Sequence, residues 1–206
     1  MEFVKFSKNL DKFYLMQNNI VIKDSSVAEG VKLCPNVCII NSTVDEGCDI
    51  EQNCCIKNSK LGKNVYVASS YIEDSEVLEN CTVGPFAHIR NGSVVGKNCR
   101  VGNFVEIKAS QIGNGCKMAH LTYVGDAVLG ENCNLGCGVV FCNYNGKIKQ
   151  KCMLGNNVFV GSNVNLVAPL NIGDDVFIAA GSTITKDLQA GTFAIERGEQ
   201  VIKQKR

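Results

Sequence analysis

The feature that most constrains this sequence is a six-residue period of aliphatic side chains. From Val27 to Ile184 an apolar residue returns every six residues, or occasionally every five. Many of these residues are followed directly by glycine, as at Gly62, Gly102 and Gly155. An amphipathic helix needs a period of about 3.6 residues, so this pattern favours short strands separated by tight turns.

Three such units build one triangular coil of about 18 residues, and successive coils stack in parallel. We therefore predict an all-β fold, a left-handed parallel β-helix of hexapeptide repeats with about nine triangular coils. Its left-handed connection is a known exception to the right-handed crossover preference. The β-helix domain is expected over 21–187, after an irregular or short helical lead-in over 1–20 and before a C-terminal tail over 188–206.

One interruption breaks the period. The step from Phe141 to Leu154 is thirteen residues, so seven extra residues are expected to protrude as a loop near 142–152. This loop carries three lysines, including Lys149. Insertions in solenoid proteins commonly lie on a functional face, so the loop is a candidate part of a binding site.

Composition narrows the class of function. The 206-residue chain has 21 basic and 20 acidic residues, which gives no electrostatic reason to expect nucleic acid or an anionic membrane as partner. No apolar run approaches the ~20 residues of a membrane span, and the N-terminus lacks a signal-peptide core. We predict a cytoplasmic protein.

The chain also holds twelve cysteines. Seven of them precede a repeat-defining apolar residue by two positions, where other coils carry valine, and are expected to be small core residues: Cys48, Cys54, Cys81, Cys99, Cys116, Cys133 and Cys152. No CxxC spacing occurs, so a structural zinc site is not expected. Many free thiols favour a reducing compartment.

Residues one coil apart stack on the same face, so columns can be read from the period. On the second face, one column is uncharged and small below a histidine: His120, Cys137, Ser162 and Ala180. Such a track could hold a thin ligand arm or allow a neighbouring prism to pack closely. The alternative for His120 is a histidine merely packed at a subunit contact.

On the third face Arg90 and Lys108 are stacked one coil apart, and the protruding loop leaves from the same face. Tyr123 lies in the neighbouring column with Glu106. Stacked cations repel, so a convergence of Arg90, Lys108 and a loop lysine suits phosphate, which arginine binds bidentately. The alternative is that Glu106 neutralises the two cations and the loop lysines are solvated.

Several segments are much more specific than the repeat. They closely resemble the C-terminal acetyltransferase domain of the bifunctional bacterial N-acetylglucosamine-1-phosphate uridyltransferase/glucosamine-1-phosphate acetyltransferase, strongly over about 77–197 and in repeat rhythm alone before that. The segments are GPFAHIRNGSVVGKNCRVGNFVEIK (84–108), MAHLTYVGDA (118–127), NLGCGVVFCNYNGKIK (134–149) and LGNNVFVGSNVNLVAPLNIGDDVFIAAGSTITKD (154–187).

The resemblance implies a homotrimer with sites between neighbouring prisms, acetyl-CoA as donor, glucosamine 1-phosphate as acceptor and no metal. His120 matches the general base. Residues matching those that hold the phosphorylated sugar are Arg90, Lys108, Tyr123, Asn134 and Lys149. Asn143 matches a further amino-sugar contact. Asn143 and Tyr144 of the same loop are also expected to bind the coenzyme, together with the residues that match acetyl-CoA contacts: Cys137, Ser162, Ala180 and Arg197.

The chain departs from the family in two ways. Cys137 stands where the family usually has alanine, and the sequence shows no Gly-rich nucleotide-binding loop. No uridyltransferase activity is therefore expected, and a separate nucleotidyltransferase is a candidate partner.

Other functions stay open. They are a hexapeptide acyltransferase for a different amine or hydroxyl acceptor, and a non-catalytic trimeric scaffold. A hexapeptide carbonic anhydrase needs three histidine ligands, and this chain has two histidines, so that function is disfavoured. A cysteine nucleophile is also disfavoured, because Cys137 and Cys142 adjoin no evident base.

Overall fold

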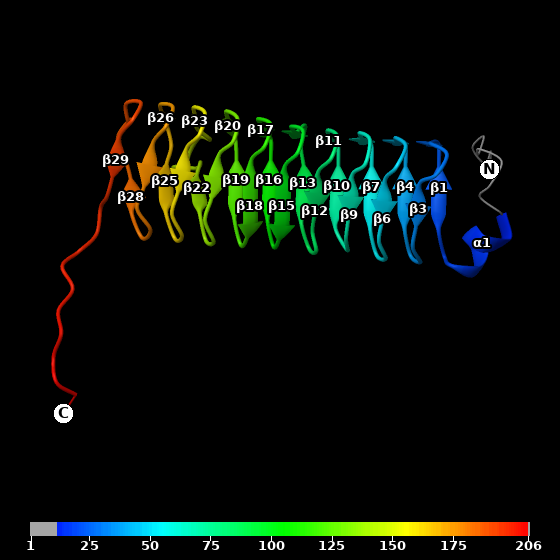
Figure 1. Ribbon diagram of the computed structural model, residues 1–206, viewed down its shortest axis with the longest axis horizontal. Helices are drawn as coiled ribbons and strands as arrows, with labels where there is room; N and C mark the ends of the chain where they lie inside the picture. The colour runs from blue at the N-terminus through cyan, green and yellow to red at the C-terminus, as the bar shows by residue number, and fades with distance from the viewer. Residues whose placement is uncertain (1–11, 206) are drawn as a thin grey trace.

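Stacked triangular coils form a long prism in the computed structural model, which describes residues 12–205 (Figure 1). A short helix α1 (Lys12–Gln17) precedes the first strand. The C-terminal segment leaves the last coil and extends away from the prism (Figure 1). The fold is the predicted left-handed parallel β-helix of hexapeptide repeats, and every strand pairing within it is parallel.

Each face of the prism is one sheet. The first sheet contains β2 (Ser26–Val27), β5 (Thr43–Val44), β8 (Lys60–Leu61), β11 (Glu76–Val77), β14 (Val94–Val95), β17 (Gln111–Ile112), β20 (Ala127–Leu129), β23 (Cys152–Leu154) and β26 (Leu170–Ile172). The second contains β3 (Lys32–Leu33), β6 (Asp49–Ile50), β9 (Tyr66–Val67), β12 (Thr82–Val83), β15 (Arg100–Asn103), β18 (Lys117–His120), β21 (Asn134–Leu135), β24 (Phe159–Val160), β27 (Phe177–Ile178) and β29 (Phe193–Ala194). The third contains β1 (Val21–Lys23), β4 (Cys38–Ile40), β7 (Cys55–Lys57), β10 (Tyr71–Glu73), β13 (His88–Arg90), β16 (Glu106–Lys108), β19 (Tyr123–Gly125), β22 (Val140–Cys142), β25 (Asn165–Val167) and β28 (Thr183–Ile184).

The prism is slightly longer than the predicted nine coils. The first sheet has nine strands, but the second and third have ten each. The additional strands are β1, which precedes the first hexad counted from the sequence, and β29, which lies within the segment expected to be a tail. Of the predicted lead-in, residues 1–11 lie outside the described part of the chain.

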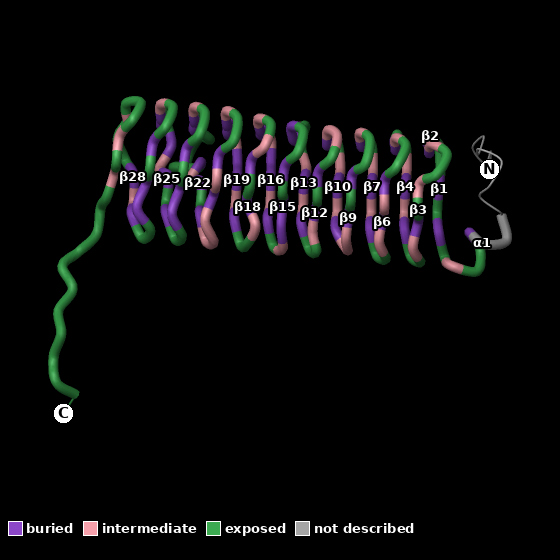
Figure 2. Tube along the Cα trace, in the orientation of Figure 1, coloured by how far each residue is buried: buried purple, intermediate pink, exposed green. Residues whose placement is uncertain are grey.

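The core is a stack of one inward side chain per strand. In a typical three-residue strand such as β7, the middle residue Ile56 is fully buried and its two neighbours face outward. Figure 2 shows this alternation along the whole prism. Truncating side chains buried in this way costs about 2–5 kcal/mol, so the hexad positions determine the stability of each coil. All seven cysteines predicted as core residues are buried, which confirms that prediction.

Polar ladders fill the corners of the N-terminal coils. Asn41 donates a hydrogen bond from Nδ2 to Oδ1 of Asn58 (2.9 Å), and Asn58 donates in the same way to Asp74 (2.8 Å). All three have positive φ, between 46° and 48°, a conformation that asparagine and aspartate tolerate better than other non-glycine residues. These corners therefore satisfy their own hydrogen-bonding groups from coil to coil.

Candidate active site

His120 ends strand β18 at a corner of the prism and is exposed to solvent. Its Nδ1 lies 2.6 Å from Oδ1 of Asn103, the residue directly opposite it on β15. Because an amide oxygen only accepts hydrogen bonds, Nδ1 must carry the proton. In the neutral imidazole, Nε2 then keeps a free lone pair and can accept a proton from a substrate. Asn103 thus sets the tautomer that a general base requires.

The small track predicted below His120 is present. Strand register places Cys137, Ser162 and Ala180 in its column, coil by coil. A Cβ on Gly136 would lie 2.6 Å from the backbone nitrogen of Ser162, and one on Gly161 would lie 2.4 Å from that of Ala180. Side chains there would collide with the next coil, so the coils stack closely along this column.

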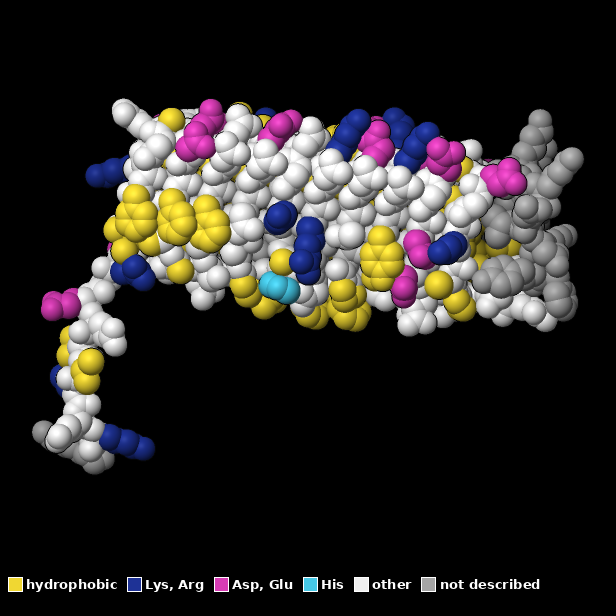
Figure 3. Space-filling model, in the orientation of Figure 1, with side chains coloured by type: hydrophobic (Ala, Val, Ile, Leu, Met, Phe, Trp, Pro, Cys, Tyr) yellow, Lys and Arg dark blue, Asp and Glu magenta, His cyan; other side chains and the backbone are white. Residues whose placement is uncertain are grey.

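Arg197 lies near the far end of this track. A Cβ built on Gly181 would be 3.7 Å from Cδ of Arg197, which puts the arginine beside the corner that follows Ala180. Phe159 is the registered neighbour of Asn134 on the second sheet, so Asn134 lies on the outer face next to the track. Figure 3 shows this face, with a histidine next to basic and hydrophobic side chains.

The predicted cations converge on the third sheet, but each has a carboxylate partner or a cationic neighbour. Arg90 contacts Oε1 of Glu106 through Nε (2.8 Å) and Nη2 (2.7 Å). Lys108 is buried and lies 3.0 Å from Oδ2 of Asp126. Glu106 therefore neutralises Arg90, as the alternative reading of the sequence expected, but a different carboxylate, Asp126, neutralises Lys108.

The protruding loop brings Lys149 against Lys108. The neighbouring Lys108 ammonium is the main reason why the pKa of Lys149 is lowered, and Arg90 contributes in the same direction. Burial by itself lowers the pKa of Lys108, but the interactions with Asp126 and Lys149 outweigh burial and raise it. The cluster holds three cationic groups and two carboxylates, so one positive charge remains for an anionic ligand.

Asn143 and Tyr144 lie in the protruding loop. Asn143 is buried and donates from Nδ2 to Oδ2 of Asp126 and to the hydroxyl of Tyr123 (3.4 Å). The structure therefore places Asn143 in the cation cluster. Tyr144 is exposed at the loop tip, where its hydroxyl donates to the carbonyl of Gly146 (2.7 Å).

An apolar ridge borders the histidine. Phe86, Phe104 and Leu121 occupy one corner column with φ values of 59°, 55° and 45°, and each is more than half exposed. The two phenylalanine rings stack with centroids 5.4 Å apart. Bulky residues with positive φ are strained, and they persist mainly at sites where that strain serves a function.

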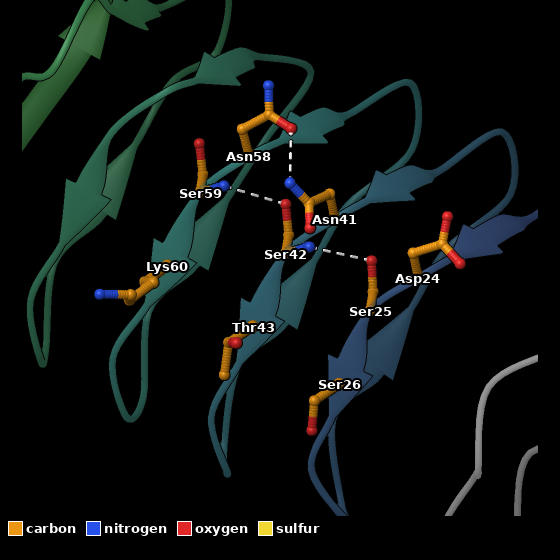
Figure 4. Close-up of a pocket in the computed structure, with 9 residues that line it drawn as sticks. All are labelled: Asp24, Ser25, Ser26, Asn41, Ser42, Thr43, Asn58, Ser59 and Lys60. Carbon is orange, nitrogen blue, oxygen red and sulfur yellow. Dashed lines mark hydrogen bonds between the residues drawn. The ribbon is translucent and has the colours of Figure 1, made fainter.

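A groove over the N-terminal coils lacks the histidine and the cation cluster of the candidate site. It has a volume of about 470 Å³ and lies over the N-terminal coils, lined by serine, asparagine and threonine side chains with Asp24 and Lys60 (Figure 4). Its polar groups bond to one another; for example, the amide of Ser42 donates to Oγ of Ser25 (3.0 Å). The groove is thus part of the corner ladders.

Sequence reasoning missed Asn103 and Asp126. Asn103 extends the histidine column by one coil and could have been found by reading that column further. Asp126 occupies the corner position that Asn41 and Asn58 fill elsewhere, so nothing in the period marks it. Within residues 12–205, no group of three or more His, Cys, Asp or Glu could hold a metal ion, and no helix is long and apolar enough to cross a membrane.

Comparisons with known proteins agree with the repeat and with the resemblance. The profile "Bacterial transferase hexapeptide (six repeats)" matches residues 74–109 and 151–186. The bifunctional protein GlmU of Clostridium acetobutylicum is 55% identical over 144 residues, which is 70% of this chain and 32% of that protein. GlmU of Shouchella clausii is 54% identical over 143 residues, 69% of this chain and 32% of that protein. The chain thus spans about a third of the length of these relatives.

Solved structures show the same fold at low identity. A UDP-N-acetylglucosamine acyltransferase from Francisella novicida has a TM-score of 0.53 at 16% identity, covering 83% of this chain and 64% of that one. PerB from Caulobacter crescentus, solved with CoA and GDP-perosamine, has a TM-score of 0.50 at 23% identity, covering 56% of this chain and 54% of that one.

Proposed function

The chain belongs to the hexapeptide-repeat family, and on that premise we propose that it transfers the acetyl group of acetyl-CoA to the amine of an amino-sugar 1-phosphate. Glucosamine 1-phosphate is the proposed acceptor and N-acetylglucosamine 1-phosphate the product. The observation that carries the proposal is His120 held by Asn103 with Nε2 free, on the same strand–corner–strand segment that leads into the cation cluster.

The spacing of the two groups supports one shared substrate. His120 precedes β19, and Asp126, which holds Lys108, follows it directly. A three-residue strand is about 10 Å long, so His120 and the cation cluster border the same short stretch of the prism, beside which one amino-sugar 1-phosphate is proposed to bind. Tyr123 opens β19 and lies between the two ends.

In the proposed reaction the acceptor amine attacks the thioester carbonyl directly. A protonated amine is not a nucleophile, so the nitrogen must lose protons before and during the attack. Nε2 of His120 takes the proton that the amine releases as the new C–N bond forms. The resulting imidazolium can return that proton to the departing CoA thiolate, which leaves the histidine neutral again. Asn103 acts as a positioning residue, since it holds Nδ1 as the donor throughout.

The cation cluster serves the sugar phosphate. Arg90, Lys108 and Lys149 together carry one more charge than their carboxylate partners, and Lys149 has the least compensation. A phosphate placed among them would relieve the repulsion between Lys108 and Lys149 and accept charge-assisted hydrogen bonds. We assign phosphate recognition to these three residues, supported by Asn143 and Tyr123.

We propose that acetyl-CoA binds along the small track. The outward column of Cys137, Ser162 and Ala180 carries only small side chains, which suits a thin pantetheine arm, and Arg197 is placed to contact a coenzyme phosphate. Cys142 does not favour a covalent acetyl-cysteine route, because burial raises the pKa of its thiol and disfavours the nucleophilic thiolate.

The proposed assembly is a cytoplasmic homotrimer in which the ridge of Phe86, Phe104 and Leu121 packs against a neighbouring copy.

The direct test is product identification. Purified chain is incubated with acetyl-CoA and glucosamine 1-phosphate, and the product is analysed by mass spectrometry and amide-sensitive NMR. N-acetylglucosamine 1-phosphate is expected, formed in step with free CoA. Coenzyme binding without an acetylated sugar would instead favour a hexapeptide acyltransferase for another acceptor. A trimer that binds no coenzyme would favour the scaffold.

A further inference from the structure

Two cysteines face outward in register on the third sheet, far along the prism from the site just described. Cys38 of β4 is the direct pairing partner of Cys55 of β7. The register also stacks Cys81, Cys99, Cys116 and Cys133, but these lie in the core. Among the described residues, Cys38 and Cys55 are the cysteines in register that face outward. Neighbouring strands lie about 4.8 Å apart, which falls within the 4.4–6.8 Å range of Cα separations found across disulfides.

These two thiols differ from the core cysteines in access. Cys38 and Cys55 are half-buried, whereas the seven cysteines at core positions are buried. Burial raises the pKa of Cys54, the residue beside Cys55, to about 11, which makes it a poor nucleophile. Besides Cys34, which has no cysteine of the described strands in register with it, the accessible thiols on these coils are Cys38 and Cys55.

The surroundings of the pair are polar and in part basic. The Cys55 thiol interacts directly with Cys38 and with Tyr71, its partner on the next coil. Lys57, two residues after Cys55, lies with Nζ 5.3 Å from the centre of the Tyr71 ring. Burial and the neighbouring Cys38 raise the pKa of the Cys55 thiol and outweigh Lys57, which acts to lower that pKa. The register of the two cysteines and their partial exposure are therefore what favour a disulfide between them.

We propose that Cys38 and Cys55 form a reversible disulfide modification site whose oxidant is a low-molecular-weight disulfide such as glutathione disulfide. One thiolate attacks a sulfur of the external disulfide, forming a mixed disulfide and releasing one external thiolate. The second cysteine then attacks the protein sulfur of the mixed disulfide and releases the other external thiolate. The protein loses two electrons and two protons, and the external disulfide becomes two thiols. The bond joins two adjacent coils.

The test uses the full chain treated with glutathione disulfide, blocked with a maleimide and cut by a glutamate-specific protease. Cleavage at Glu46 and Glu51 separates the two cysteines, so a linked peptide pair reports the disulfide. We expect a disulfide-linked pair of peptides that dithiothreitol separates by reduction. No dimer of the chain should appear on a non-reducing gel. The link should be absent from Cys38→Ser and Cys55→Ser and present in the matched controls Cys34→Ser and Cys54→Ser.

Three results would overturn the proposal. One is that Cys38 and Cys55 stay free after a treatment that modifies Cys142, which is also half-buried. Another is a stable mixed disulfide with glutathione on either residue without a protein link. The third is a link that survives in Cys38→Ser or disappears in Cys34→Ser. None of these readouts depends on acetyl transfer, so the proposal stands or falls separately from the proposed function.

Discussion

The N-terminal coils and the coils around His120 share one scaffold but use its corners in opposite ways. At the corner that leads into the third sheet, the N-terminal coils place Asn36 and Asn53, which hydrogen-bond to each other (3.2 Å). Later coils place Phe86, Phe104 and Leu121 at the same position, strained and exposed. The repeat builds the prism, and departures from it mark the surface where function is expected.

The opposite corner of the third sheet shows the same contrast. Asn41, Asn58 and Asp74 form a chain of hydrogen bonds that satisfies itself. Asp126 occupies the same column further along but turns to Lys108 and Asn143. The corner position that completes the hydrogen-bonded ladder in the N-terminal coils therefore binds the buried Lys108 in the later coils. The contrast predicts that substitutions in the later coils affect activity and that matched substitutions in the early coils affect stability alone.

The largest expected effect is that of His120→Ala. Loss of the general base should lower kcat by about 100-fold or more while the fold and coenzyme binding are retained. Steady-state kinetics measure kcat, and titration with the coenzyme measures its binding. The matched control is Asn53→Ala in the early coils, which should keep full turnover. Undiminished turnover in His120→Ala would remove the histidine from the mechanism.

Arg90→Ala comes next. Loss of a charge-assisted pair of hydrogen bonds to phosphate should raise the KM for glucosamine 1-phosphate by about 10–100-fold and change the KM for acetyl-CoA little. Lys60→Ala, an exposed cation of the early coils, is the control and should change neither constant. If the KM for glucosamine 1-phosphate were the same in Arg90→Ala and in the parent protein, the result would contradict the phosphate site.

Alkaline pH should weaken phosphate binding by a smaller factor of a few-fold. The pKa of Lys149 is lowered by Lys108, so Lys149 loses its proton at lower pH than an ordinary lysine near 10.4. Affinity should therefore be full below that pKa and fall as pH rises through it. Calorimetric titration with glucose 1-phosphate, which cannot be acetylated on nitrogen, measures this. In Lys149→Arg the charge persists and the decline should shift to higher pH; an identical decline would exclude Lys149 as its cause.

A corner exchange should give the smallest effect, on stability. Asn53→Leu places a bulky side chain in a left-handed conformation and should lower the free energy of unfolding by about 1–2 kcal/mol. The reverse change, Leu121→Asn, should relieve strain of similar size in the isolated chain. Urea denaturation compares the two with the parent. Equal destabilisation by both changes would show that the corners do not differ as described.

Much of this arrangement follows from the sequence because the period converts residue number into position. A fixed step per coil places Arg90 over Lys108 and Ser162 over Ala180 without any knowledge of side-chain packing. Where the period is interrupted, that conversion fails, so the period alone does not place Asn143 of the loop in the cation cluster. Asp126 was missed for a related reason, since its position is structural in other coils and only its partners make it functional.

The most direct test of the central claim compares acceptors under one set of conditions. Acetyl-CoA consumption is measured with glucosamine 1-phosphate, galactosamine 1-phosphate and unphosphorylated glucosamine. We expect turnover with a phosphorylated amino sugar and a kcat/KM for unphosphorylated glucosamine that is lower by at least about 100-fold, since the cation cluster would then lack its ligand. Equal kcat/KM values with and without the phosphate would contradict the account.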